Sequence, residues 1–409
     1  MATTAVEICG VKLRNPIMMA SGAHPGTARA VQTLAHGGAA AVELKPLSYK
    51  SLPASKDIEI YHPFFKSADG TATTIIGASI GRKTVTYEEW FERELLGSLE
   101  AGIPLVANVT VPIKPSFLAR NNLTEDGQVA MIVEKMVLLE EKGFSWIDLN
   151  LQTPFGGFSA GLDALLYGNW ERVIREVKKA VKIPVMAKLP YLHNARDYAV
   201  RAEQAGVDGI VFGGAGRAYA VDIESGLPRI PTPGGYVSTQ GPGKKAMVLA
   251  NVVDAWQAVK VPIIGVAGIW TGADVIEYIM AGATCVQLYT AAVVRGFGVF
   301  RRINDEVKAW LDAHGYSSLD EIRGMAARHW GEGYAEQPKI AVDARLCDGC
   351  GECERVCANY KQAISFQWQV PVPRIDKTLC VGCGFCSVVC PRQALAIERL
   401  EWVRYPYDH

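Results

Sequence analysis

Short apolar segments recur along the chain and are separated by turn residues and by longer, partly polar segments. Eight of them are continuous runs of mostly aliphatic residues, at positions 16–22, 40–45, 104–110, 146–151, 184–189, 209–214, 262–268 and 285–290. Continuous apolar strands, unlike alternating ones, are typical of a parallel sheet buried on both faces. We therefore expect eight parallel strands in this chain.

The segments between these strands carry apolar residues at three- and four-residue spacing, which predicts amphipathic helices. They cover residues 87–101, 129–142, 170–181, 195–205, 244–258 and 272–281. Several end in a glycine directly before the next strand, as helix C-termini often do. Eight strand–helix units over roughly 300 residues predict an α/β fold of the (β/α)8 TIM-barrel type.

The end of the barrel is marked by a second kind of local signal. Ser318 and Glu321 have the spacing of a capping box, which predicts a last helix that runs through Trp330. Residues 331–339 have the composition of a linker. We therefore predict a barrel domain over residues 1–335 and a second domain over residues 336–409.

Three of the predicted connections that follow strands are long, at residues 111–128, 153–169 and 215–243. Loops longer than about 12 to 15 residues in a compact domain are usually functional, and the strand-following loops of a barrel hold its active site. Plain surface insertions are the alternative, which is weakened because all three loops fall on one predicted face.

Composition excludes several classes of protein. Hydrophobic residues make up 49% of the chain, which excludes a disordered or fibrous protein. The 42 basic residues are balanced by 42 acidic ones, so no charge excess indicates nucleic acid or an anionic membrane as a partner. No apolar stretch approaches the ~20 residues of a membrane span, and the first residues contain no signal core. We expect a cytoplasmic protein.

Eight of the ten cysteines form two runs with the spacing C-x2-C-x2-C-x3-C. Bacterial ferredoxins with two [4Fe–4S] clusters use this spacing, and the fourth cysteine of each run binds the other cluster. The predicted ligand sets are Cys347, Cys350, Cys353 and Cys390 for one cluster, and Cys380, Cys383, Cys386 and Cys357 for the second. The second domain is therefore expected to be a small ferredoxin-like α+β domain. A structural zinc site, the alternative, favours two separated C-x2-C pairs.

The barrel segments resemble the dihydroorotate dehydrogenase family. The resemblance lies in Arg14-Asn15-Pro16 with the following strand, Glu43-Leu44-Lys45, Asp148-Leu149-Asn150, Ala187-Lys188-Leu189 and the segment 265–272. With the cysteine runs it is closest to the FMN-containing subunit of the dihydropyrimidine dehydrogenase branch. It implies an FMN- and iron–sulfur-dependent oxidoreductase that acts on a CH–CH or C=C bond of a small cyclic substrate.

The same resemblance implies an FMN site at the carboxyl ends of the strands. Lys188 matches the family lysine beside flavin N1, where a cation stabilises the reduced ring. A barrel-mouth salt bridge is the alternative role for each lysine. The other implied cofactor-binding residues are Ala20, Ser21, Gly22, Lys45, Asn108, Asn150, Gly241, Gly265, Ala267, Gly268, Tyr289 and Thr290.

The acid or base that handles the substrate proton is not settled by the resemblance. Thr153 stands where the family carries its catalytic cysteine or serine, and no cysteine lies in the following loop. Tyr167 and His193 have better acid–base chemistry than a threonine hydroxyl. We therefore keep all three as catalytic candidates, together with Lys45 and Asn150.

The positions that recognise a pyrimidine ring also depart from the family. Asn150 is kept, but an Asn-Thr pair of the family corresponds to Gly213-Gly214 here, and another asparagine falls near Ile75-Ile76. This loss of amides predicts a substrate other than uracil or thymine, whereas reduction of uracil or thymine is what the family resemblance implies by default. An electron-transfer subunit whose barrel serves a partner enzyme is the alternative function, and a flavin-free phosphate-binding barrel is a third.

No strand is followed by a G-x-G-x-x-G dinucleotide fingerprint. Electrons are therefore expected to reach FMN through the clusters, from a ferredoxin or from a flavoprotein subunit that oxidises NAD(P)H. The resemblance also implies an oligomer.

Overall fold

The computed structural model describes residues 2–22, 24–46, 58–66, 72–80, 86–110, 122, 124–151, 169–213, 216–232, 235–334, 338–367, 369–398 and 402–404. The chain divides into two compact units, Met1–Arg328 and His329–His409. No helix in these described ranges is long and apolar enough to cross a membrane.

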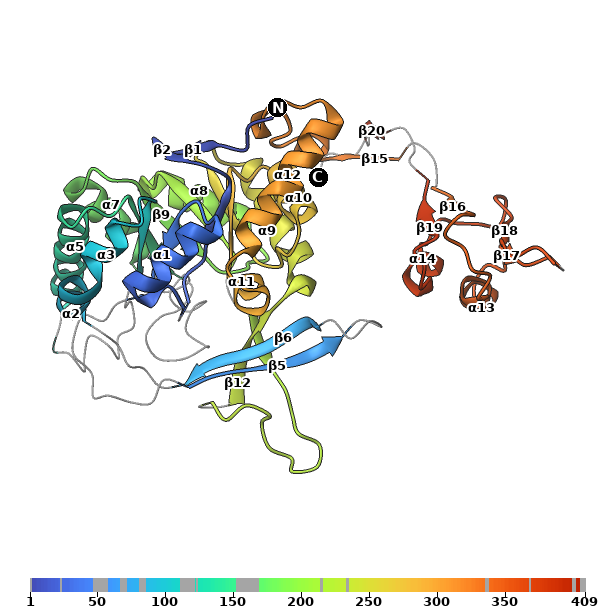
Figure 1. Cartoon of the computed structure of the whole chain (residues 1–409), viewed down its shortest axis with the longest axis horizontal. Coiled ribbons are helices and arrows are strands. Elements are labelled where there is room, and N and C mark those ends of the chain that lie inside the picture. The colour runs from blue at the N-terminus through green and yellow to red at the C-terminus, as the bar shows by residue number, and fades with distance from the viewer. Residues whose placement is uncertain are drawn as a thin grey trace. The chain divides into compact units, whose positions relative to one another are not determined.

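Eight parallel strands close into a barrel in the first unit, and helices surround it (Figure 1). Each strand falls inside one of the eight predicted segments, so the predicted fold class is confirmed. The strands are β3 (Ile17–Met19), β4 (Val42–Glu43), β7 (Leu105–Thr110), β8 (Trp146–Asn150), β9 (Val185–Leu189), β10 (Gly209–Phe212), β13 (Ile263–Val266) and β14 (Cys285–Leu288).

All six predicted helical segments contain helices, and α1, α11 and α12 are additional to them. Helix α7 shows why these helices pack on the barrel. Its Trp170, Val173, Ile174 and Val177 recur at helical spacing and are fully buried. The helices are α1 (Ala28–Gly37), α2 (Tyr87–Trp90), α3 (Leu96–Leu99), α5 (Glu125–Glu141), α7 (Trp170–Ala180), α8 (Ala195–Ala205), α9 (Lys245–Trp256), α10 (Gly272–Met280), α11 (Thr290–Arg295) and α12 (Val299–His314).

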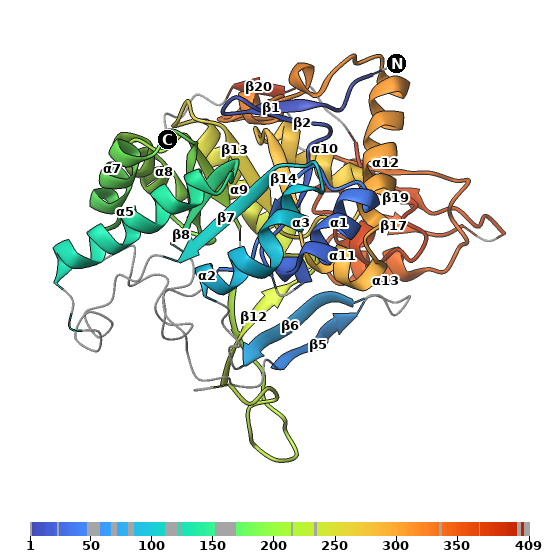
Figure 2. The ribbon, with the colours of Figure 1, turned by 60° about the vertical axis from the view of Figure 1, so that its left-hand side comes forward.

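A four-stranded antiparallel sheet, β11-β12-β6-β5, lies at one end of the barrel (Figure 2). Its strands are β5 (Ile58–Lys66), β6 (Ala72–Ile80), β11 (Gly216–Tyr219) and β12 (Tyr236–Gln240). The segment 215–243, predicted as one long loop, contains two of these strands, β11 and β12, and β12 pairs with β6 from a distant part of the chain. The N-terminal hairpin of β1 (Val6–Ile8) and β2 (Val11–Leu13) lies at the opposite end (Figure 1).

The predicted last helix through Trp330 is not formed. The capping box of Ser318 and Glu321 is present, but it begins only a short 3-10 turn, Leu319–Glu321. The backbone N–H groups of Gly324 and Ala326 donate instead to carbonyls of α10, at 2.9 and 3.0 Å. Hydrogen bonds to a neighbouring element thus replace those that would have continued the helix.

In its described residues, the second unit contains two short α-helices and three two-stranded sheets. The expected linker at 331–339 holds a strand, β15 (Glu332–Tyr334), which pairs with β20 (Trp402–Arg404). The helices are α13 (Glu352–Ala358) and α14 (Phe385–Val389), and the other strands are β16 (Ile340–Val342), β17 (Ile364–Ser365), β18 (Arg374–Ile375) and β19 (Leu395–Ile397). Cys353, Cys380 and Cys386 belong to its buried core.

Candidate functional site

The barrel interior contains a cluster of buried polar side chains, which we call the interior network. Its members come from five of the eight strands, and each has 7% or less of its surface exposed. They are Glu43 on β4, Asn108 on β7, Asp148 and Asn150 on β8, Lys188 on β9 and Gln287 on β14. Such burial is costly unless the polar atoms pair with one another.

Lys188 is the only cation of the interior network and contacts three of its members. Its ammonium donates to the Glu43 carboxylate and to Gln287 Oε1, the latter at 3.0 Å. Asp148 Oδ2 lies 3.8 Å from the same nitrogen. The salt bridge considered for Lys188 therefore exists, but it is buried inside the barrel.

Asn108 and Asn150 continue the network on the neighbouring strands. Asn150 Nδ2 donates to Asn108 Oδ1 at 3.0 Å, and Asn108 donates to the Glu43 carboxylate. Asn150 pairs in register with Lys188 across β8 and β9. The backbone N–H of Ser21 donates to Glu43 Oε2 at 3.3 Å, which joins the segment after β3 to the same cluster.

Asp148 is the second acid of the network and is fully buried. Burial raises its pKa well above the ordinary value of 3.8, and the nearby negative charge of Glu43 raises it further, although Lys188 acts in the opposite direction. The indole Nε1 of Trp146 donates to Asp148 Oδ1 at 3.0 Å. Asp148 therefore favours its protonated form inside the barrel.

Five of the implied cofactor-binding residues lie where β13 and β14 end. Gly265 is in β13, Ala267 and Gly268 follow it, and Tyr289 and Thr290 follow β14. Ala267 has φ of +124°, a backbone conformation that suits glycine far better. Helix α11 begins at Thr290, so the N–H groups of its first turn start at the strand end.

The nearby N-terminus of α10 is already occupied by carboxylates. The N–H groups of Trp270 and Thr271 donate to Asp274 Oδ2 at 2.9 and 2.8 Å. The N–H of Gly272 donates to Glu306 Oε2 at 2.6 Å. The N–H groups of Thr271 and Gly272 are therefore already used by carboxylates of the same chain.

Gly22 lies against the ring of Tyr289. A Cβ atom at Gly22 would overlap that ring, so only glycine fits the close approach of the segments after β3 and β14. Tyr289 Oη is also 2.8 Å from His24 Nδ1. Ala20 is buried beside the same strand end, and its N–H donates to Leu288 O at 2.9 Å.

Gly241 and Lys244 lie where the four-stranded sheet returns to the barrel. Gly241, with φ of +97°, precedes the 3-10 turn Pro242–Lys244. Lys244 is buried, and its Nζ has no hydrogen-bond partner among the described residues. Burial lowers the pKa of Lys244 to about 7. Thr290 Oγ1 donates to Gln240 Oε1 at 2.8 Å, which ties this segment to α11.

The structure describes three of the five catalytic candidates. Thr153 and Tyr167 lie outside the described residues. His193 is exposed, and its ring contacts Tyr191 edge-on with the centroids 5.5 Å apart. Lys45 is half-buried directly after β4. Of the five candidates, the structure places Asn150 in the interior network.

Sequence reasoning missed four of the site's polar residues: Glu43, Asp148 and Gln287 as network members, and Lys244 as a buried cation. A signal was present for the first three, since each is a polar residue within an otherwise apolar barrel strand. A polar residue in a strand buried on both faces must point to a partner. Nothing in the sequence distinguished Lys244 from its neighbour Lys245.

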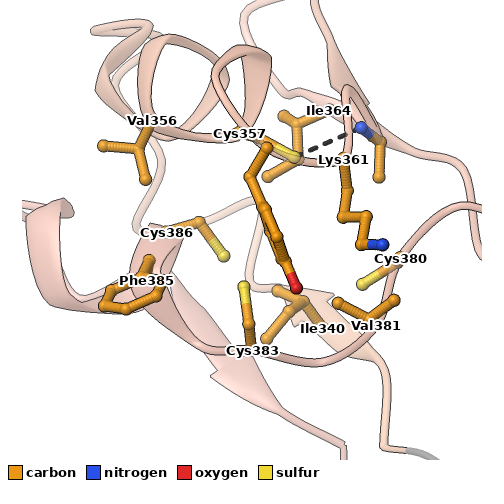
Figure 3. A pocket seen from close by; sticks show the side chains of 12 residues that line it. Ile340, Val356, Cys357, Lys361, Ile364, Cys380, Val381, Cys383, Phe385 and Cys386 are labelled. Carbon is orange, nitrogen blue, oxygen red and sulfur yellow. Dashed lines mark hydrogen bonds between the residues drawn. The ribbon is translucent and has the colours of Figure 1, made fainter.

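One of the two predicted cysteine sets lines a single pocket in the second unit. Cys357, Cys380, Cys383 and Cys386 face it together with apolar residues that include Ile340 and Ile364 (Figure 3). Cys357 comes from α13 and the other three from the second run. A [4Fe–4S] cluster needs four thiolates around one space, and the residues present fit it.

In the other predicted cysteine set, Cys390 accepts the same kind of local hydrogen bond as Cys357 does in the first set. Ala394 N–H donates to Cys390 Sγ at 3.2 Å, just as Ala363 N–H donates to Cys357 Sγ at 3.2 Å. Cys347 lines a second pocket with Pro391, the neighbour of Cys390. Within the described residues, no group of three or more Cys, His, Asp or Glu side chains is arranged to hold a single metal ion.

A (β/α)8 barrel with a buried lysine network, followed by a module with converging cysteines, defines the class of flavin- and iron–sulfur-dependent oxidoreductases. The dihydroorotate dehydrogenase family model matches residues 130–311, and a 4Fe-4S dicluster domain matches residues 346–394. The chain belongs to the dihydroorotate dehydrogenase family. It is an FMN-dependent oxidoreductase that acts on a CH–CH bond of a cyclic substrate and carries a 4Fe–4S electron-transfer domain.

Similar proteins are catalytic subunits of dihydroorotate dehydrogenase B (NAD(+)). That of Methanocaldococcus jannaschii is 32% identical over 325 residues, which cover 78% of this chain and 97% of the relative. Those of Methanothermobacter thermautotrophicus and Pyrococcus abyssi are 30% and 29% identical, with 97% and 99% of each relative covered. Each relative is thus covered almost completely, whereas about a fifth of this chain extends beyond the match.

Proposed function

We propose that FMN binds at the carboxyl ends of the barrel strands with Lys188 at its N1 edge, and that the enzyme reduces or oxidises a small cyclic substrate that is not a pyrimidine. The observation that carries the site is the position of Asn150 and Lys188, which pair in register on adjacent strands and are both buried. FMN supplies hydride transfer when it is bound. Around the FMN, the chain would supply a fixed cation, amide groups and glycines that let the backbone come close to it.

The case for a different substrate rests on two positions. Gly213 has φ of +147°, and a Cβ atom there would overlap the Val266 carbonyl, so no amide side chain fits where the family has its asparagine. Ile76 is 1% exposed and packs with Ala220, Ile230 and Val237 in the core of the four-stranded sheet. A pyrimidine would leave ring N–H and carbonyl groups without these partners, which discriminates strongly against it.

We further propose that the second domain carries two [4Fe–4S] clusters, with Cys357 and Cys390 exchanged between the two cysteine runs. The clusters would pass single electrons between FMN and an external partner, either a ferredoxin or an NAD(P)H-oxidising flavoprotein subunit. The chain would work in the cytoplasm, where iron–sulfur cysteines stay reduced, and as an oligomer. Thr153, Tyr167 and His193 stay candidates for the proton transfer.

The test uses the holoenzyme purified without oxygen. Its flavin is reduced with a viologen dye and then mixed with uracil, orotate or non-pyrimidine cyclic compounds that contain a polarised C=C bond. We expect reoxidation of the flavin by a compound of the last group and not by the pyrimidines. Rapid turnover of uracil or orotate would contradict the substrate proposal. Reduced clusters with no reoxidation by any compound would favour the electron-transfer alternative.

A further inference from the structure

Three ionisable side chains lie together inside the barrel and form the charged part of the interior network. Glu43 and Asp148 are fully buried, and Lys188 is 4% exposed. Removing such groups from water is costly unless they are paired. The interior network therefore contains two acids and one base, and this unequal number of acids and bases needs an explanation.

The surroundings of Lys188 contain no further charge among the described barrel strands that flank or face it. On one side β8 contributes Asp148, at 3.8 Å, and on the other side β10 (Gly209–Phe212) has no titratable residue. Across the barrel β4 contributes Glu43, and β14 contributes the neutral Gln287. Two acids therefore surround one cation, with neutral amides around them.

The two acids lie around the same ammonium, since Glu43 accepts a hydrogen bond from Lys188 Nζ and Asp148 Oδ2 lies 3.8 Å from that nitrogen. Burial, together with the nearby Glu43 charge, raises the pKa of Asp148, so this acid favours its protonated form. Two neighbouring acids of this kind behave as a pair with one proton and one negative charge. With Lys188 as an ammonium, the trio is neutral overall, which lowers the cost of its burial.

We propose that Glu43 and Asp148 are positioning residues which together keep Lys188 protonated before the flavin is reduced. This inference rests on the proposed FMN site at Lys188. Among the described residues, two of the three ammonium donors are used, by Glu43 and Gln287, which leaves one for the flavin edge. The positive charge that stabilises the reduced ring is then present before reduction, so Lys188 does not have to take up a proton together with the electrons.

The proposal predicts how many protons the protein takes up when its flavin is reduced. In the wild type, two electrons supplied by an electrode and one proton enter the flavin, and Lys188 already has its proton. In the double variant Glu43→Gln/Asp148→Asn, burial without a carboxylate deprotonates Lys188 in the oxidised enzyme. Reduction then takes up two protons per two electrons, one on the flavin and one on Lys188.

The experiment measures the flavin midpoint potential of the holoenzyme between neutral pH and about pH 9. Its dependence on pH gives the number of protons taken up. We expect one proton in the wild type, one in each single variant, because one carboxylate suffices, and two in the double variant. One proton in the double variant would overturn the proposal, and so would two protons in either single variant.

If the double variant does not fold, infrared spectra of the wild type and the single variants test the proposal. The wild-type holoenzyme should show the infrared C=O band of a buried protonated carboxylic acid. Asp148→Asn and Glu43→Gln should each lose the band, because the single remaining acid is ionised beside Lys188. Absence of the band from the wild type would overturn the proposal. A chain that folds without FMN would instead refute the proposed flavin site, and the infrared result would still report on the protonated acid.

Discussion

Cys357, the last cysteine of the first run, lines the same pocket as Cys380, the first cysteine of the second run. The two residues belong to different halves of the second domain, and the ferredoxin spacing predicts this exchange. A cluster bound there would join both halves covalently through its irons. The second domain is therefore expected to need its clusters in order to stay folded.

This arrangement predicts the iron content of a cysteine variant. Cys357→Ala should lower the iron content from about eight to about four atoms per chain, because one [4Fe–4S] cluster loses its fourth ligand. Colorimetric iron and sulfide analysis after anaerobic purification measures it. Cys285→Ala is the matched control, since Cys285 is buried in the barrel core and should leave the iron content unchanged. Full iron content in Cys357→Ala would contradict the proposed ligand exchange.

The Lys188–Glu43 ion pair predicts a large effect on stability. Lys188→Met removes the cation and leaves two buried acids without their partner, which should cost about 3 kcal/mol of unfolding free energy. Adding Glu43→Gln should recover much of that loss, because the uncompensated negative charge is then gone. Urea unfolding of the barrel at neutral pH compares the single and double variants. Equal stability of the two variants would show that the pair does not couple.

The burial of Lys244 predicts a dependence of stability on pH. Its pKa is about 7 in the folded chain and 10.5 in the unfolded chain, so the unfolded state binds more protons between these values. The unfolding free energy of the wild type therefore rises with pH in this window, by up to about 1.4 kcal/mol per pH unit. Lys244→Met should be more stable than the wild type near neutral pH, and the gap should close as the pH rises.

The neighbouring lysine gives the control for that experiment. Lys245 is paired with Asp274 at 2.5 Å and with Glu277 at 2.7 Å. Lys245→Met should therefore destabilise the barrel and should not show the closing gap. A Lys244→Met variant with a constant difference from the wild type at all pH values would argue against a neutral buried lysine.

Ala267 predicts a stabilising substitution. Its φ of +124° is strained for any residue with a Cβ atom, and Ala267→Gly should relieve about 1 kcal/mol. Thermal unfolding should show a higher midpoint for this variant. The control is Ala199→Gly in helix α8, where the backbone is helical and glycine should lower stability by about 1 kcal/mol. A loss of stability in Ala267→Gly would mean that its conformation is not strained.

The barrel was predictable because its strands are buried on both faces. Each strand lies in a mostly apolar run such as 262–268, and such runs can be recognised without knowledge of their partners. The sheet β11-β12-β6-β5 was not predicted, although β6 contains Thr and Ile residues typical of strands. Its pairing joins segments about 160 residues apart, and pairing over such a distance leaves no local signal.

The sequence by itself determined the eight strands of the barrel and the two cysteine runs, since apolar runs and ligand spacing are local properties. The resemblance to the family added Lys188 as a candidate. Only the tertiary structure decided that Glu43, Asp148 and Lys188 form one buried cluster. Those residues lie on three strands that are distant in sequence, and barrel closure brings them together in a buried interior. Charge states there depend on distance and burial, which are properties of the fold and not of any local segment.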